Sequence, residues 1–167
     1  AARMKAELVD AADALVIDGK YYGVPFYIMN YALYYNKDYF AEAGIEEVPT
    51  TWAEFREAAI KCTVRDDNGK LVRAGYYMEM GQQEHIIWKN IMEQWGQPQF
   101  SEDQPTVLWN SSEAGYEAYE FFMNLLIEDK VSEYGFGEGG YHTFYTGLGC
   151  MYHAGPQIIG VIRTEAP

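Results

Sequence analysis

The chain has 167 residues, enough for one domain with a real core, and its hydrophobic content of 49% excludes a disordered chain. Its 12 Lys and Arg against 25 Asp and Glu give a net charge of −13, which disfavours nucleic acid, anionic membranes and polyanionic ligands. No apolar run approaches the roughly 18 residues of a spanning helix, so we expect no direct membrane insertion. No signal peptide opens the chain, which predicts a mature form, a fragment or a cytoplasmic protein.

The predicted elements begin with a helix over residues 3–16, where apolar residues recur at helical spacing. A polar turn at 18–20 leads into a short strand over 21–24, which Pro25 ends because proline has no N–H to donate. The aromatic-rich stretch 31–35 predicts a second strand. A helix follows it, with Asn36 as N-cap and Gly44 as the C-terminal stop.

The next helix has the clearest start signal in the chain. Thr51 and Glu54 are spaced for a capping box, in which each side chain bonds the backbone N–H of the other residue. Apolar residues then recur on one face of the helix, at Trp52, Phe55, Ala59 and Cys62. This face predicts where the helix meets the core.

The second half of the chain alternates strands and helices. Strands are predicted over 73–79, 107–109 and 149–153, and helices over 84–95, 111–128, 143–145 and 156–163. Asn110 and Glu113 are spaced for a second cap, and Pro156 suits the first helical position. The alternation predicts an α/β fold with a mixed, mostly parallel sheet flanked by helices.

Several local patterns predict no cofactor and no metal. The glycines of the acidic loop 131–140 formally match a dinucleotide fingerprint, but no strand precedes them and Glu138 would repel a pyrophosphate. Cys62 and Cys150 do not form a CxxC pair, and neither lies near a histidine at the spacing of metal ligands. Both fall on apolar faces of their predicted elements. We interpret them as two buried thiols, with a disulfide as the alternative.

Four segments, in order, resemble the extracellular solute-binding proteins of carbohydrate ABC transporters (family 1, maltose-binding-protein-like). They are GKYYGVPF with ALYYNKDYFAEAG, then TTWAEFREAA, then HIIWKNIMEQWGQPQF with WNSSEAGYEAYEFFMNLLIED, and finally FYTGLGCMYHAGPQ. The resemblance implies a type II periplasmic-binding-protein-like lobe. Residues 1–167 would then be a single α/β lobe or a partial chain, mostly the C-terminal lobe, and 18–36 would cross between the lobes.

The resemblance also implies a function. Two lobes would close by a hinge on a sugar or oligosaccharide and deliver it to the membrane subunits of an ABC permease, without catalysis, cofactor or metal. The location would be extracellular or periplasmic, with a lipid anchor in the full-length parent. Maltose-binding relatives carry a stacking Trp where Gln157 stands and a carboxylate where Met29 stands. We therefore expect a ligand that is held differently from maltose.

The ligand-binding candidates fall in three places: past Pro25, at the start of the helix over 84–95, and at the start of the last helix. They are Tyr27, Met29, Asn30, Glu84, His85, Trp88, Gly155 and Gln157. Rings and side-chain amides suit a sugar, which has apolar C–H faces and hydroxyl edges. Packing is the alternative for Tyr27 and Trp88, a turn cap for Asn30, and an ordinary strand-to-helix turn for Gly155 and Gln157.

Three other functions stay open as alternatives. An enzyme is not expected, because no spacing singles out a pair among the 25 acidic residues and no nucleophile elbow is present. A protein-interaction module without a small ligand would show an exposed apolar patch in place of a polar cleft. A solute-binding protein for a solute other than a sugar is the third alternative.

Overall fold

The computed structural model describes residues 13, 15–27, 29–79, 84–103 and 106–166, without the side chains of 84 and 85. Contacts divide the chain into two units, Ala1–Tyr31 and Ala32–Pro167, and each is described by itself. Most of the helix predicted over 3–16 lies outside the described residues.

The first unit contains a small antiparallel hairpin of β1 (Val16–Ile17) and β2 (Lys20–Tyr21). Asp18 and Gly19 connect the strands, and their φ angles are 49° and 72°. Two successive left-handed residues form the hairpin turn whose twist matches the paired strands. Val16 therefore belongs to a strand, which corrects the C-terminal end of the predicted helix, and the strand predicted over 21–24 ends at Tyr21.

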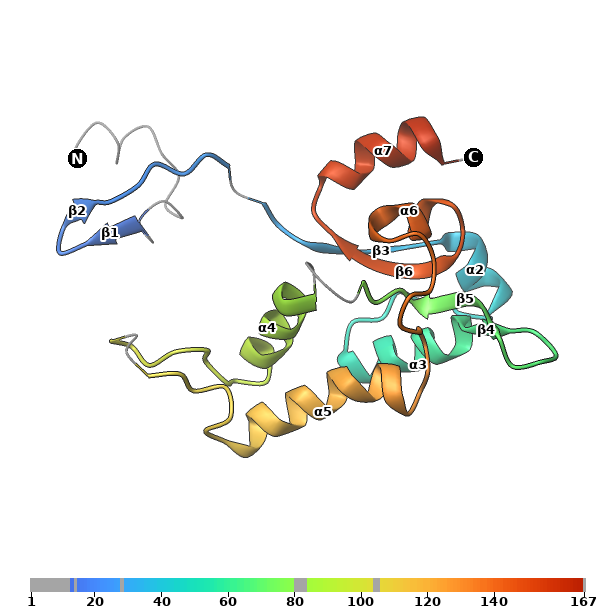
Figure 1. Cartoon of the computed structure of the whole chain (residues 1–167), viewed down its shortest axis with the longest axis horizontal. Coiled ribbons are helices and arrows are strands. Elements are labelled where there is room, and N and C mark those ends of the chain that lie inside the picture. Colours follow the sequence, from blue (N-terminus) through green and yellow to red (C-terminus); the bar gives the residue numbers. More distant parts are fainter. Residues whose placement is uncertain (1–12, 14, 28, 80–83, 104–105, 167) are drawn as a thin grey trace. The chain divides into compact units, whose positions relative to one another are not determined.

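The second unit is built around a four-stranded mixed sheet (Figure 1). Its strands, in spatial order, are β3 (Ala32–Tyr35), β6 (Gly149–Ala154), β5 (Leu71–Tyr76) and β4 (Val64–Arg65). Only the β5–β6 pairing is parallel, while β3–β6 and β4–β5 are antiparallel. The predicted mixed α/β fold is confirmed, but "mostly parallel" is wrong.

The reason for the antiparallel β4–β5 pair is a tight turn between the two strands. The Asp66 carboxylate accepts hydrogen bonds from the N–H groups of Asn68 and Lys70, and Gly69 has a φ of 80°. So short a connection allows only an antiparallel pair, because a parallel pair needs a crossover of a dozen residues or more. β5 and β6 have such a crossover, which contains α4 and α5.

Helices cover the sheet in two groups. They are α2 (Lys37–Glu42), α3 (Trp52–Cys62), α4 (Glu84–Gln94), α5 (Glu113–Ile127), α6 (Gly140–Tyr145) and α7 (Gln157–Glu165). Figure 1 shows α3 and α5 on one side of the sheet and α6 and α7 on the other. Two clusters of buried residues follow this division, one with Phe55, Ile91 and Leu125, the other with Phe144 and Ile158.

The predicted caps are confirmed where they depend on neighbours in sequence. Asn36 Oδ1 accepts hydrogen bonds from the next turn, and Thr51 and Glu54 form the capping box. The cap of α5 is Ser112, two residues beyond the predicted Asn110. Pro156 is the N-cap of α7, one position before the first helical residue where it was expected. The strand predicted over 107–109 is a single bridge between Phe100 and Val107.

Candidate ligand-binding site

The carboxyl ends of the parallel strands β5 and β6 lie at the same edge of the sheet. Tyr77 to Glu79 follow β5, and Gly155 to Gln157 follow β6 and open α7. Ligands of open α/β sheets bind outside the carboxyl ends of the strands, because the loops there leave a crevice. This edge is therefore the candidate site within the second unit.

A carboxylate held by a buried tyrosine lies at this edge. The Tyr152 hydroxyl donates a hydrogen bond to Glu79 Oε2 at 2.7 Å, and only 1% of Tyr152 is exposed. The Tyr152 ring packs against Tyr77 and Phe144, which fixes the direction of its hydroxyl. A carboxylate has about four acceptor positions, so this bond leaves Glu79 able to accept from a ligand hydroxyl.

Gly155 and Gln157 lie in contact at the start of α7. A Cβ atom added to Gly155 would lie 2.4 Å from Gln157 Oε1, so the glutamine amide folds back over the Gly155 backbone. No side chain caps this end of α7, where the N–H groups of Ile158 and Ile159 donate to the carbonyl oxygens of Gly155 and Pro156. Gln157 is exposed, which leaves its side-chain amide able to meet ligand oxygens.

Trp88 packs in the manner of a core residue. Its ring lies 4.6 Å from the Trp109 ring and 6.2 Å from Tyr119, in edge-to-face contacts, and it borders the larger core cluster. Its indole N–H is buried and has no hydrogen-bond partner in the described part of the chain. These contacts support the packing alternative for Trp88.

For two of the remaining candidates the structure describes only the backbone, and the other three belong to the first unit. Glu84 and His85 are the first two residues of α4, and their side chains are outside the description. Tyr27 is 66% exposed and its ring contacts Phe26, while Met29 and Asn30 are exposed as well. Within that unit, Tyr27 is therefore not part of a packed core.

Two histidines of the second unit, His142 and His153, have side chains that the structure describes, and each ring lies beside a polar neighbour. His153 Nδ1 lies 3.1 Å from the Tyr76 hydroxyl, and burial lowers the pKa of His153 to about 4, so its imidazole is neutral at pH 7. His142 Nδ1 lies 3.4 Å from a Glu138 carboxylate oxygen. Over the described ranges, no group of three or more His, Cys, Asp or Glu residues could hold a metal ion.

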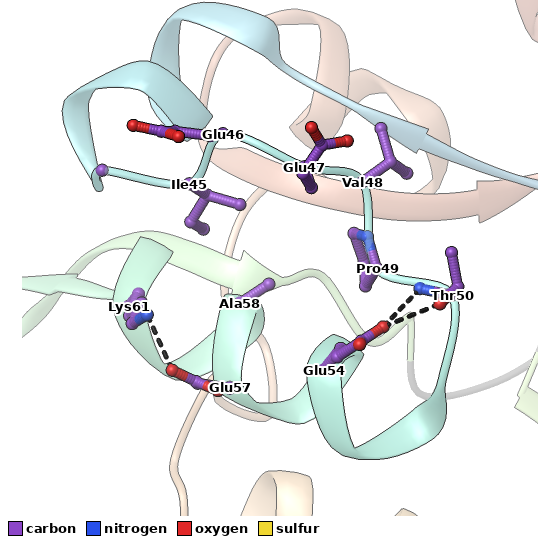
Figure 2. A pocket seen from close by; sticks show the side chains of 11 residues that line it. Ile45, Glu46, Glu47, Val48, Pro49, Thr50, Glu54, Glu57, Ala58 and Lys61 are labelled. Atoms are coloured by element: carbon purple, nitrogen blue, oxygen red, sulfur yellow. Dashed lines mark hydrogen bonds and ion pairs between the residues drawn. The ribbon is translucent and has the colours of Figure 1, made fainter.

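A hollow of about 340 Å³ lies elsewhere, between the segment 44–50 and one face of α3 (Figure 2). Glu54 accepts hydrogen bonds from Thr50, and Glu57 forms an ion pair with Lys61 at 2.7 Å. No aromatic ring belongs to its lining, and none of the predicted site residues does. It therefore lacks the stacking plate that a sugar site needs.

Comparison with known families identifies the chain. The family model for the bacterial extracellular solute-binding proteins matches residues 3–163. The chain belongs to this family. The predicted family is thereby confirmed. None of the described helices is both long and apolar enough to cross a bilayer.

Solved structures of solute-binding proteins share the fold. The chain is 29% identical to an ABC substrate-binding protein from Listeria monocytogenes in complex with cycloalternan, with a TM-score of 0.77, over 97% of this chain and 41% of that one. It is 26% identical to a cyclic alpha-maltosyl-1,6-maltose binding protein from Arthrobacter globiformis, with a TM-score of 0.73, over 99% and 41%. The chain thus spans about two fifths of the length of these proteins.

A short segment of the chain matches a curated relative at higher sequence identity. The diacetylchitobiose binding protein DasA of Streptomyces coelicolor is 48% identical over 40 residues, which are 24% of this chain and 9% of that protein.

The sequence pattern does not single out two residues of the site. It predicts Glu79 only as the last residue of one strand and Tyr152 only as part of another. A carboxylate directly after an apolar strand was the signal for Glu79, since that position lies at a strand's carboxyl end. Nothing local marked Tyr152 as its partner, because the two residues are far apart in sequence.

Proposed function

We propose that the chain takes part in the non-catalytic binding of a carbohydrate for uptake by an ABC transporter. Family membership supports a solute-binding role, and two relatives above 25% identity are described with cyclic oligosaccharides. In this proposal two lobes close by a hinge on a sugar or oligosaccharide. In the same proposal, residues 1–167 are a single α/β lobe or a partial chain of the two-lobe protein, and residues 18–36 cross between the lobes.

The observation that carries this proposal is the pair of polar groups at one sheet edge. The Glu79 carboxylate, oriented by Tyr152, accepts hydrogen bonds, and the Gln157 amide both donates and accepts them. Sugar hydroxyls need both kinds of partner. The predicted ligand-binding residues Tyr27, Met29, Asn30, Glu84, His85, Trp88, Gly155 and Gln157 remain part of this proposal, with packing as the alternative for Tyr27 and Trp88.

The proposal extends to partners and location. The loaded protein delivers its sugar to the membrane subunits of a permease, works outside the cytoplasm as the family's description says, and carries a lipid anchor. It catalyses no reaction on the sugar. The negative net charge suits a neutral ligand as well as a charged one, so it does not decide the ligand class.

Calorimetric titration of the intact protein with a panel of sugars tests the proposal. Glu79→Gln removes a charged acceptor, and Gln157→Ala removes an amide, so each should weaken the sugar that binds best by about ten-fold or more. Glu46→Gln, in the separate hollow of Figure 2, is the matched control and should leave the affinity unchanged.

Three outcomes would contradict it. Heat with peptides, polyamines or organic anions, and none with any sugar, would overturn the ligand class. Binding only to another protein would favour an interaction module. Sugar products that accumulate during the titration, as detected by chromatography, would show an enzyme.

A further inference from the structure

Cys62 and Cys150 meet in the core although they come from distant parts of the sequence. Cys62 is the last residue of α3, Cys150 is the second residue of β6, and both are completely buried. Both side chains belong to the same cluster of buried residues, and each thiol shifts the pKa of the other. The two sulfur atoms are therefore neighbours between a helix and the sheet.

A glycine in β5 explains this close approach. The register of β5 and β6 pairs Ala74 with Gly149 and Tyr76 with Met151, so Gly75 lies beside Cys150. A Cβ atom at Gly75 would lie 1.7 Å from the Ala59 carbonyl oxygen and 2.5 Å from Thr63 Oγ1. The last turn of α3 thus rests directly on the β5 backbone, and it carries Cys62 to Cys150.

The helix end is held in this place by two further bonds. Arg73 Nε donates to the Cys62 carbonyl oxygen at 3.2 Å, and the Thr63 hydroxyl donates to the Ala59 carbonyl oxygen at 2.8 Å. The thiol–thiol contact is therefore built into the packing of α3 on the sheet.

The surroundings make the two thiols unequal. The hydrogen bond from Cys150 and the nearby positive charge of Arg73 lower the pKa of the Cys62 thiol, while the same bond and burial raise that of Cys150. The thiolate is the form that attacks a disulfide. In the folded chain, Cys62 therefore has the larger thiolate fraction of the two.

We propose that Cys62 and Cys150 form a disulfide that fastens α3 to β6. The proposal rests on the proposed function in one respect, the extracytoplasmic compartment, where oxidising conditions form and preserve disulfides. Two thiols buried in the same cluster, between one helix end and one strand, need little movement to become bonded, whereas thiols that point apart would need the backbone to move.

The bond forms by thiol–disulfide exchange with a disulfide donor, such as the disulfide form of an oxidoreductase or oxidised glutathione. One of the two cysteine thiolates attacks the donor, forms a mixed disulfide and releases one donor thiolate. The other cysteine then loses its proton and attacks the sulfur of the first, and the second donor sulfur leaves as a thiolate. The two cysteines are oxidised and the donor disulfide is reduced to two thiols. Because both thiols are buried in the fold, the exchange precedes the final packing of α3.

Oxidative refolding of the full chain tests this inference. The chain is unfolded in urea with a reductant and then refolded in a mixture of reduced and oxidised glutathione. We expect its intact mass to fall by about 2 Da, the two hydrogens lost, and non-reducing peptide mapping to join the peptides that carry Cys62 and Cys150. We also expect the oxidised form to unfold at a higher urea concentration than the reduced form, because the bond constrains the unfolded chain.

The single variants Cys62→Ser and Cys150→Ser are controls that should show neither the mass change nor the linked peptides. Two titratable thiols in the denatured protein after oxidative refolding would overturn the inference, and so would glutathione adducts without the internal bond. Sugar binding is measured separately by calorimetry. A failure of the disulfide proposal can therefore be distinguished from a failure of the proposed sugar-binding function.

Discussion

At the scale of a single residue, the absence of a side chain at Gly75 allows α3 to pack closely on the sheet. The Cβ atom that any other residue would bring would lie 1.7 Å from the Ala59 carbonyl oxygen, well inside contact distance. The clash would be with helix backbone, which cannot turn aside as a flexible side chain can. The close packing of α3 on the sheet therefore depends on glycine at this position.

We predict that Gly75→Ala lowers the free energy of unfolding by about 3 kcal/mol or more, because an overpacked core must move backbone. Gly160→Ala is the matched control: Gly160 lies inside α7 with nothing within 4 Å of an added Cβ. It should raise stability by about 0.5–1 kcal/mol, since alanine favours a helix interior. Urea denaturation measures both, and equal effects of the two substitutions would contradict the packing argument.

His153 is a second residue whose environment has a measurable consequence. Its imidazole is enclosed by Phe55 and Tyr76, and burial lowers its pKa from 6.5 to about 4. The unfolded chain therefore binds a proton at His153 more tightly than the folded chain does. The resulting stability is complete above pH 6.5 and is lost as the pH falls from 6.5 towards 4.

We predict that lowering the pH from 7.5 to 5 reduces the free energy of unfolding by about 2 kcal/mol through the titration of His153 alone. The measurement is urea denaturation at both pH values, for the natural chain and for His153→Gln. Glutamine has no proton to gain, so the variant should lose less stability over this range, while the other titrating groups are common to both proteins. Parallel pH profiles for the two chains would show that His153 is not the cause.

At the scale of one element, α3 shows a helix whose start is determined locally. The Thr51 hydroxyl accepts from the Glu54 N–H at 3.2 Å, and Glu54 Oε2 accepts from the Thr51 N–H at 3.0 Å. The two hydrogen bonds from Thr50 and the bond from the Thr51 N–H to its carboxylate lower the pKa of Glu54. All the partners lie within five residues, which is why this cap could be predicted from the sequence.

We predict that Thr51→Ala destabilises the protein by about 1 kcal/mol, the usual cost of a lost N-cap. Thr51→Ser keeps the hydroxyl and should stay close to the natural stability. Thermal or urea unfolding compares the three chains. If serine were as destabilising as alanine, the threonine methyl group and not the capping hydroxyl would be responsible.

The start of α5 shows where local prediction stops. Asn110 and Ser112 are both suitable cap residues, and the sequence favoured Asn110 because Glu113 follows at the capping-box spacing. In the structure the Ser112 hydroxyl bonds the side chain of Gln97 and accepts from the Gly115 N–H. Gln97 follows the preceding helix, α4, so a contact between two elements selects the cap.

At the scale of the whole molecule, the alternation of strands and helices predicted the α/β class, but not how the strands pair. Strand direction depends on the connections: the short turn at 66–69 makes β4 and β5 antiparallel, and the long segment with α4 and α5 lets β5 and β6 run parallel. The candidate site depends on that parallel pair. A different order of the same strands would separate Glu79 from Tyr152.

The sequence by itself determined most element positions, the caps of α2 and α3, the burial of both cysteines and membership of the solute-binding family. These features depend on side chains a few residues apart, or on motifs in a fixed order. Only the tertiary structure decided the mixed sheet, the Glu79–Tyr152 pair and the contact of Cys62 with Cys150. Each of these joins residues distant in the chain, and no local periodicity or spacing carries the information that they meet.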